Sequence, residues 1–186
     1  SHTAADRPWF FYVPFHAVHT PLVEHEQRWR EMNAHIQHAD RQLYAAALSH
    51  MDHAVGRMVE ALDRTGQRNR TLIIYTSDNG AQVHHVGNTY PPPDPKLKHF
   101  SSNAPLRGKK SEVYEGGFRV PAFVHWPQRL EPRKVHTPMH VVDWMPTLAN
   151  LVGFAAKQPT LWKGQDVWPL LAETSQNIPE RTIYTV

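Results

Sequence analysis

A long amphipathic segment between two short apolar runs is the feature that most constrains the fold of this chain. Residues 40–65 carry apolar side chains at intervals of three and four, which gives one apolar stripe along a helix. Asp40 is the expected N-cap and Gly66 the expected C-cap. The flanking runs, 9–13 and 72–75, predict strands buried on both faces. Strand, helix and strand form a right-handed βαβ unit, so we predict an α/β fold built on part of a mainly parallel sheet flanked by helices.

Further elements follow toward the C-terminus. Residues 120–126 predict a third strand, and Pro121 indicates its beginning or an edge position. Residues 143–151 predict a short helix with Asp143 as its N-cap. Residues 183–186 resemble the beginning of another strand. These elements extend the predicted alternation of strands and helices.

The composition excludes several classes of protein. Hydrophobic residues make up 40% of the 186 residues, which is enough for a core. The net charge is only +3, from 20 Lys and Arg against 17 Asp and Glu, and this weak excess does not indicate nucleic-acid binding. The absence of cysteine excludes disulfides, thiolate metal sites and a cysteine nucleophile within these residues. No apolar run reaches the length of a membrane span.

A polar turn, Ser-Asp-Asn-Gly, directly follows the second predicted strand. In open α/β sheets, ligands bind beyond the carboxyl ends of the strands. The Asp78 carboxylate and the Asn79 amide oxygen are hard oxygen donors of the kind that Ca²⁺ and Mg²⁺ prefer. Asp-Asn-Gly is also ordinary turn chemistry, so these residues by themselves leave a metal site and a simple turn both open.

His19 lies just beyond the first predicted strand. If the first two strands are parallel, His19 and Asp78 lie at the same edge of the sheet. An imidazole at that edge could donate a hydrogen bond to an anionic oxygen or to a leaving group. His16 is a weaker candidate for the same role. The alternative is a surface-loop histidine, in a chain that has 14 histidines.

Lys110 ends a basic run, Leu-Arg-Gly-Lys-Lys at 106–110, which precedes Tyr-Glu-Gly-Gly at 114–117. A lysine ammonium is a compact charge that can neutralise sulfate or phosphate oxygens. The glycine pair permits a backbone turn that other residues resist. Composition alone leaves a solvated basic loop as the alternative.

His84 and His85 lie in residues 80–103, which show no periodicity and contain four prolines. A structureless stretch of this length inside a domain is usually functional or mobile. Adjacent histidines in an extended segment point to opposite faces and cannot easily share one metal ion. We therefore predict that His84 and His85 contact substrate rather than a metal.

Taken in order, these motifs resemble the sulfatase family, a branch of the alkaline phosphatase superfamily. The matching segments are residues 18–22, 51–56, 71–80, 106–110, 114–121, 143–148 and 164–168. The basic run and the Asp-Val-Trp at 166–168 look most like the arylsulfatase B type, the N-acetylgalactosamine-4-sulfatases. The resemblance implies that residues 1–153 are the C-terminal part of the catalytic domain. Residues 154–186 would then be a linker and the start of a small C-terminal subdomain.

The resemblance also implies a reaction, sulfate ester hydrolysis, and a role for each candidate residue. Asp78 and Asn79 would be two of the metal ligands, with Ca²⁺ as the usual ion and Mg²⁺ as the alternative. Lys110 would contact the sulfate group. His19 would bind a sulfate oxygen or the bridging oxygen of the leaving group. The implied substrate is a sulfated small molecule or glycan, and family members are periplasmic, secreted or lysosomal.

The sequence departs from the family pattern because it lacks the nucleophile motif. Family members carry a Cys/Ser-x-Pro-x-Arg motif whose first residue becomes formylglycine, and further metal and sulfate ligands come from the N-terminal half. No cysteine and no Ser-x-Pro-x-Arg occur here. We therefore expect the formylglycine to lie outside these residues and the chain alone to be inactive. Two oxygen ligands also cannot fill the roughly six to eight positions that Ca²⁺ prefers.

Two other functions stay open at this point. The first is hydrolysis of phosphomonoesters, phosphonates or phosphodiesters by a member of the same superfamily. The second is a non-catalytic fragment or binding module that keeps the fold without turnover. In either case we expect the isolated chain to self-associate, because the strand at 9–13 would lack a neighbour and exposed strand edges pair with one another.

Overall fold

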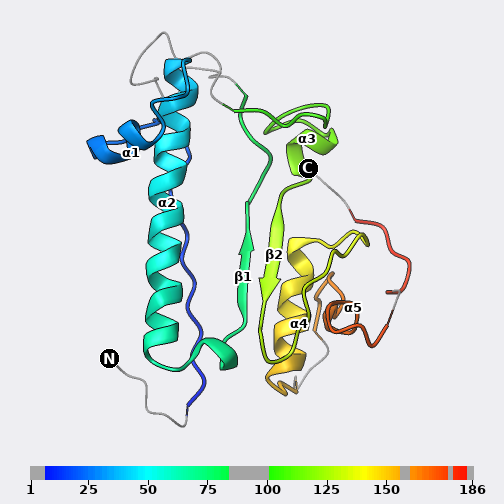
Figure 1. Cartoon of the computed structure of the whole chain (residues 1–186). Helices are drawn as coiled ribbons and strands as arrows, with labels where there is room; N and C mark the ends of the chain where they lie inside the picture. The colour runs from blue at the N-terminus through cyan, green and yellow to red at the C-terminus, as the bar shows by residue number, and fades with distance from the viewer. Residues whose placement is uncertain (1–6, 84–100, 156–159, 176–177, 184–186) are drawn as a thin grey trace. The chain divides into compact units, whose positions relative to one another are not determined.

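The computed structural model describes residues 7–83, 101–155, 160–175 and 178–183. The chain divides into two compact units, unit 1 with Ser1–Ala61 and Asp78–Val120, and unit 2 with Leu62–Ser77 and Pro121–Val186. The predicted division at residues 153 and 154 stays a prediction. Figure 1 shows the elements, which are α1 (Gln27–Met32), α2 (Ala39–Arg64), η1 (Arg68–Arg70), β1 (Ile73–Thr76), α3 (Glu115–Phe118), β2 (Ala122–His125), η2 (Val141–Asp143), α4 (Trp144–Leu151) and α5 (Trp168–Leu171).

Helix α2 confirms the long predicted helix to within one residue at each end. Asp40 lies inside the first turn of α2 rather than at the N-cap. In the first turn, a carboxylate interacts favourably with the positive end of the helix dipole. Gly66 has a φ of +67°. Its N–H donates to the carbonyl of Asp63 at 3.0 Å, and that of Gln67 donates to Leu62 at 2.8 Å. This pair of hydrogen bonds is a Schellman motif, so the predicted glycine C-cap is confirmed.

The predicted buried strand at 9–13 is wrong. Among the described residues, the sheet contains only β1 and β2, and Figure 1 draws 9–13 as an extended segment without a strand. The side chains of Phe10, Phe11 and Tyr12 are 79%, 71% and 75% exposed. A strand buried on both faces needs a packed layer on each face, and no such layer covers these rings. The predicted βαβ unit is therefore not formed.

Strands β1 and β2 confirm the strands predicted at 72–75 and 120–126, and β2 begins directly after Pro121. The strand predicted at 183–186 lies outside the described residues except for residue 183. They pair antiparallel, with Tyr75 opposite Phe123. The two rings stack, with centroids 5.1 Å apart, as a cross-strand aromatic pair. The mixture of helices with strands agrees with the α/β class. The predicted parallel sheet is not confirmed, because the described strand pair is antiparallel.

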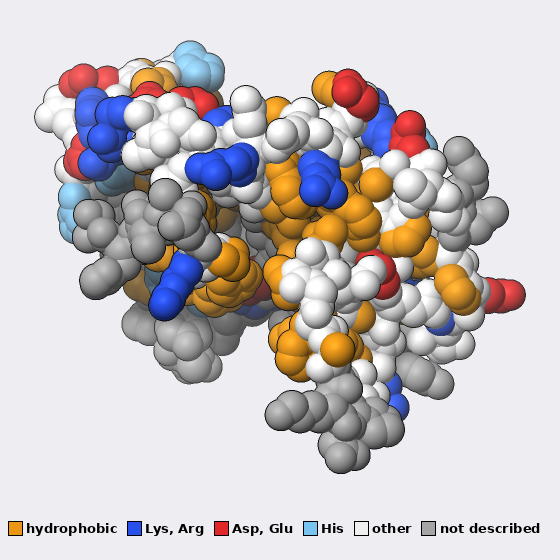
Figure 2. Space-filling view, turned by 90° about the horizontal axis from the view of Figure 1, so that it is seen from below, with side chains coloured by type: hydrophobic (Ala, Val, Ile, Leu, Met, Phe, Trp, Pro, Cys, Tyr) orange, Lys and Arg blue, Asp and Glu red, His pale blue; other side chains and the backbone are white. Residues whose placement is uncertain are grey.

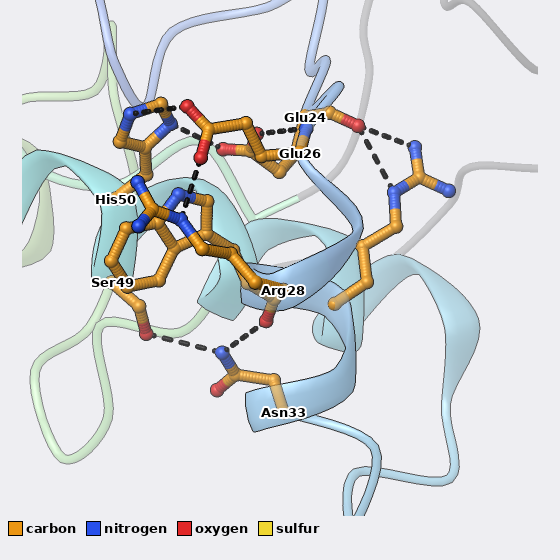
Figure 3. A network of polar contacts seen from close by, with 8 residues as sticks. Glu24, Glu26, Arg28, Asn33, Ser49 and His50 are labelled. Carbon is orange, nitrogen blue, oxygen red and sulfur yellow. Dashed lines mark hydrogen bonds and ion pairs between the residues drawn. The ribbon is translucent and has the colours of Figure 1, made fainter.

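Polar contacts join α1 and its flanking residues to α2 within unit 1 (Figure 3). The buried carboxylate of Glu24 accepts a hydrogen bond from Nδ1 of His50 at 3.0 Å. The His50 ring stacks on the buried Trp29, with ring centroids 5.2 Å apart. The side-chain amide of Asn33 donates to the Trp29 carbonyl at 2.9 Å and to the Ser49 hydroxyl at 3.1 Å. The packing of α1 is thus specified by directional contacts as well as by apolar burial.

A buried carboxylate organises unit 2. Asp143 is 1% exposed, accepts hydrogen bonds from the N–H groups of His140 at 2.7 Å and Gln165 at 3.0 Å, and forms an ion pair with Arg181. Burial raises the pKa of the Asp143 carboxyl, but Arg181 and the two backbone donors outweigh it and hold the pKa below its usual range. Asp143 precedes α4, as predicted, yet its side chain does not cap that helix. It fixes three separate segments of the chain instead.

Large hydrophobic side chains reach the surface of the protein, as the orange areas of Figure 2 show. Within the described part of the chain, no helix is both long and apolar enough to cross a membrane. Exposed apolar surface of this kind usually marks a contact with another chain or segment.

We predict that the isolated chain self-associates through residues 9–13, because this apolar segment is exposed and lies outside the sheet. Size-exclusion chromatography with light scattering should show dimers or larger species at micromolar concentrations. Replacing Phe10 and Tyr12 together by lysine should shift the population toward monomer. A monodisperse wild-type monomer that melts cooperatively would contradict this prediction.

We predict that Asp143→Asn lowers the free energy of unfolding by about 3–5 kcal/mol near pH 7, because it leaves the partly buried Arg181 guanidinium without its counter-charge. The folded pKa of Asp143 lies below its unfolded value, so its contribution is fully present above about pH 4 and is lost as the pH falls through the folded pKa. The gap between the wild type and the variant should therefore be constant from about pH 5 to 7 and should narrow in stronger acid. Urea unfolding followed by tryptophan fluorescence measures the gap. A gap that stays constant into strong acid would refute the assignment.

Candidate functional site

Backbone contacts within unit 1 bring the predicted metal-ligand turn, residues 78–81, together with the basic loop that carries Lys110, residues 106–114. The N–H of Gly80 donates to the carbonyl of Gly117 at 2.8 Å. The N–H of Lys110 donates to the carbonyl of Ala81 at 3.2 Å. Residues 78–81 therefore lie against both α3 and the basic loop, although about 30 positions separate them in sequence.

The Asp-Asn-Gly segment is a turn, as its composition indicates. It directly follows β1, and the Asn79 N–H donates to Oδ1 of Asp78 at 3.0 Å. The side-chain amide of Asn79 donates to the Gly80 carbonyl at 3.2 Å, which leaves its oxygen pointing away from that contact. The Asp78 side chain is exposed and Asn79 is half-buried. The segment can therefore be a turn and still present the side-chain oxygens of Asp78 and Asn79 as metal ligands.

The donor set fits a hard cation but does not complete a coordination sphere. Asp78 and Asn79 offer a carboxylate and an amide oxygen, the ligand types that Ca²⁺ and Mg²⁺ take. The described ranges contain no group of three or more His, Cys, Asp or Glu side chains placed to hold a metal ion. Any cation bound at this turn would need further ligands from outside these ranges or from water.

Asn103 links the turn to the basic loop, and the sequence did not single it out. Its Oδ1 accepts a hydrogen bond from the Ala81 N–H at 2.8 Å, and its Nδ2 donates to the Ala81 carbonyl at 2.8 Å. The same Nδ2 donates to the Gly108 carbonyl at 3.1 Å. Nearby, the Ser101 hydroxyl donates to the carbonyl of Gln82 at 2.7 Å. Ala81 lies 22 positions from Asn103, and Gln82 lies 19 positions from Ser101, so no local sequence pattern could have identified these contacts.

Three glycines allow the backbones of this region to approach closely. A Cβ atom at Gly80 would lie 1.8 Å from the carbonyl oxygen of Gly116. One at Gly116 would lie 2.3 Å from the oxygen of Gly108, and one at Gly117 would lie 2.0 Å from that of Glu112. Gly116 and Gly117 lie in α3 without a positive φ. The glycine pair is thus required for close packing rather than for the backbone turn that the sequence suggested.

Two cations of the basic loop are engaged within the loop itself. The Arg107 guanidinium stacks on the Tyr114 ring at 3.8 Å from its centroid and donates to the Tyr114 hydroxyl at 2.8 Å. Lys109 forms an ion pair with Glu112. Lys110 is half-buried, and among the described residues it forms no ion pair. The loop therefore distinguishes Lys110 from its two basic neighbours.

The described contacts of His19 lie within its own loop. Its N–H donates to the His16 carbonyl at 2.8 Å, and its Nδ1 donates to the Thr20 carbonyl at 2.6 Å. The prediction that His19 and Asp78 share a sheet edge depended on a strand at 9–13, which is not formed. The place of His19 in the site therefore stays a prediction. His84 and His85 lie outside the described residues.

We predict that Gly80→Ala lowers the free energy of unfolding by about 3 kcal/mol, because the added Cβ overlaps a backbone carbonyl that cannot move away freely. Gly56→Ala is the matched control. Gly56 lies inside α2, where a Cβ would meet nothing within 4 Å, so this change should stabilise the protein by about 0.5–1 kcal/mol. Thermal unfolding followed by circular dichroism distinguishes the two. A Gly80→Ala protein as stable as the wild type would show that the close approach is absent.

Comparison with known proteins gives one consistent result. The family described as Sulfatase matches residues 2–154. Arylsulfatase J of Mus musculus is 36% identical over 168 residues, covering 90% of this chain and 26% of the relative. Steryl-sulfatase of Rattus norvegicus is 35% identical over 170 residues, covering 89% of this chain and 27% of the relative.

A solved structure is similar to this chain in fold. The crystal structure of Ps i-CgsB in complex with k-i-k-neocarrahexaose superposes with a TM-score of 0.71 at 32% identity. The match covers 84% of this chain and 32% of that one. The chain therefore spans about a quarter to a third of the length of the relatives that it matches.

Proposed function

Because the chain belongs to the sulfatase family, we propose that it supplies one part of the active site of a sulfuric ester hydrolase. One observation carries this proposal: the Asp78-Asn79 turn lies against the loop of Lys110, held by the Gly80 to Gly117 and Lys110 to Ala81 hydrogen bonds. A cation site beside a lysine ammonium is suited to an anionic group such as a sulfate ester, whose cleavage develops negative charge on the leaving oxygen.

The proposed metal is Ca²⁺, with Mg²⁺ as the alternative. Asp78 and Asn79 would hold it through one carboxylate and one amide oxygen, with the remaining ligands supplied by residues outside this chain. When bound, the cation would orient the sulfate group and neutralise charge on its oxygens. The exposed position of Asp78 at the end of β1 leaves its carboxylate accessible for this role.

Lys110 is the proposed contact to the sulfate oxygens. Arg107 and Lys109 are engaged by Tyr114 and Glu112, so the loop can hold its shape without using the Lys110 ammonium. A half-buried ammonium interacts more strongly with an anion than a fully solvated one, because water screens it less. Lys110 would thus stabilise the negative charge that develops during cleavage of the sulfate ester.

His19 is the proposed partner of the leaving group. Its Nδ1 donates to the Thr20 carbonyl, which fixes the orientation of the ring. An N–H donor at the other ring nitrogen, Nε2, would stabilise the bridging oxygen as the bond to sulfur breaks. His84 and His85 are proposed to contact the rest of the substrate, a sulfated sugar or aryl compound of the arylsulfatase B type.

The nucleophile is proposed to lie outside these 186 residues. The chain has no cysteine and no Ser-x-Pro-x-Arg, so a formylglycine would come from further sequence. The chain alone would then bind but not hydrolyse a sulfate ester, because acceleration requires a positioned nucleophile as well as charge stabilisation.

We predict that Lys110→Met lowers kcat/KM for nitrophenyl sulfate by about 100-fold in the full-length polypeptide that contains this chain. Lys109→Met is the matched control and should change kcat/KM by less than about threefold, since Lys109 is paired with Glu112.

His19→Ala should slow the reaction far more than His16→Ala. Chelation followed by titration with Ca²⁺ or Mg²⁺ should restore activity in the wild type and not in Asp78→Ala.

Three outcomes would refute the proposal. Faster hydrolysis of nitrophenyl phosphate than of the sulfate ester would assign the site to phosphoester hydrolysis. Full-length sequence without a Cys/Ser-x-Pro-x-Arg motif, together with no turnover, would assign it to a binding module. Equal effects of Lys109→Met and Lys110→Met would remove Lys110 from the site.

A further inference from the structure

We infer that Asn103 is a positioning residue of this site, because its side-chain amide fixes the metal-ligand turn against the loop that carries Lys110. The inference deepens the proposed function and rests on it for its catalytic meaning. Asn103 itself would touch neither the metal nor the substrate.

The amide of Asn103 replaces a backbone partner. It pairs with both the N–H and the carbonyl of Ala81, each at 2.8 Å, as a neighbouring strand would. Its second donor reaches the Gly108 carbonyl at 3.1 Å, so both N–H groups of the amide are used. Ala81 lies three residues beyond Asp78, and Gly108 lies two residues before Lys110.

One carbonyl couples the two segments directly. The Ala81 oxygen accepts hydrogen bonds both from the Asn103 amide and from the Lys110 N–H at 3.2 Å. A carbonyl has two lone pairs, so these two donors satisfy it. A displacement of Asn103 would therefore move Ala81 relative to the backbone of Lys110.

Strand pairing does not hold the two segments joined by Asn103 together. Residues 78–83 and 101–110 belong to no strand, so no ladder of backbone hydrogen bonds sets their register. The Ser101 hydroxyl extends the contact to the Gln82 carbonyl at 2.7 Å. Side chains at 101 and 103 thus do what strand pairing does elsewhere in the fold.

The consequence for catalysis is geometric. If Asp78 and Asn79 hold a cation, a sulfate group bound by both that cation and the Lys110 ammonium would need the two at a fixed separation. Catalytic groups must be held within about 0.5 Å of their productive positions, and looser placement costs rate. Substitution of Asn103 should therefore lower kcat more than it raises KM.

Two variants separate the contributions of the amide. Asn103→Asp keeps an acceptor for the Ala81 N–H but places a carboxylate against the carbonyls of Ala81 and Gly108. Asn103→Ala removes all three hydrogen bonds. Asn33→Asp is the matched control, because Asn33 also donates twice in the same unit, to the Trp29 carbonyl and the Ser49 hydroxyl (Figure 3).

The first test is hydrogen exchange of the backbone amides in the full-length polypeptide. In Asn103→Ala, the amides of Ala81 and Lys110 should exchange at least about tenfold faster relative to those of α2, since three hydrogen bonds are lost locally. In Asn103→Asp, the Ala81 amide should stay protected while that of Lys110 is exposed. Asn33→Asp should leave both amides unchanged relative to the rest of unit 1.

The second test is kinetic. Both Asn103 variants should lower kcat on nitrophenyl sulfate by about tenfold to 100-fold and raise the Ca²⁺ concentration for half-maximal activity, with a change in KM of less than about threefold. Asn33→Asp should lower the melting temperature without changing either kinetic quantity. Asn103 variants that lose stability but keep both the local exchange pattern and kcat would overturn the inference.

The two tests also separate this inference from the proposed function. If the full-length polypeptide hydrolyses no sulfate ester but Asn103→Ala exposes the Ala81 and Lys110 amides, the positioning role stands and the proposed reaction fails. If sulfate hydrolysis is normal in Asn103→Ala, the positioning role fails and the reaction stands.

Discussion

The close approach of Gly80 to α3 is the contact on which the rest of the candidate site depends. A carbonyl oxygen lies only 1.8 Å from where a Cβ of residue 80 would be, so no other residue fits without moving the backbone of Gly116. This approach allows the Gly80 N–H to reach the Gly117 carbonyl. Asp78 and Asn79 precede this anchor directly, and Lys110 is attached one residue beyond it, at Ala81. The positions of the chemical groups thus follow from contacts between backbones.

Directional polar contacts carry much of the specificity in both units, because the apolar core is small. The buried hydrophobic residues among those described are few, and they are Leu22, Trp29, Ala46, Ala47, Val167, Leu170 and Leu171. In unit 2 a buried ion pair, Asp143 with Arg181, fixes three segments. In unit 1 the amides of Asn33 and Asn103 have comparable roles. A protein with this balance is sensitive to the loss of single polar side chains, since each leaves buried partners unsatisfied.

What the sequence predicted was local, and what it missed was long-range. Periodicity placed α2 to within one residue, and Gly66 ended it as expected, because both depend on neighbours within one turn. The run at 9–13 had the composition of a buried strand, but burial requires partners that the pattern cannot supply. Asp143 was placed at the start of α4, yet its carboxylate serves Arg181, 38 positions away. Asn103 offered no signal, since Ala81, with which it makes two hydrogen bonds, lies 22 positions away.

The basic loop shows how a short sequence can separate structural charges from chemical ones. Arg107 lies on the face of Tyr114, and Lys109 is paired with Glu112, so each is stabilised where it is and costs little to keep there. Lys110 has its backbone tied to Ala81, but it has no such charge partner among the described residues. Under the proposed function, a sulfate group at the adjacent turn would be the charge partner of the Lys110 ammonium. The loop thus holds Arg107 and Lys109 by internal contacts and places Lys110 where the proposed function requires a cation.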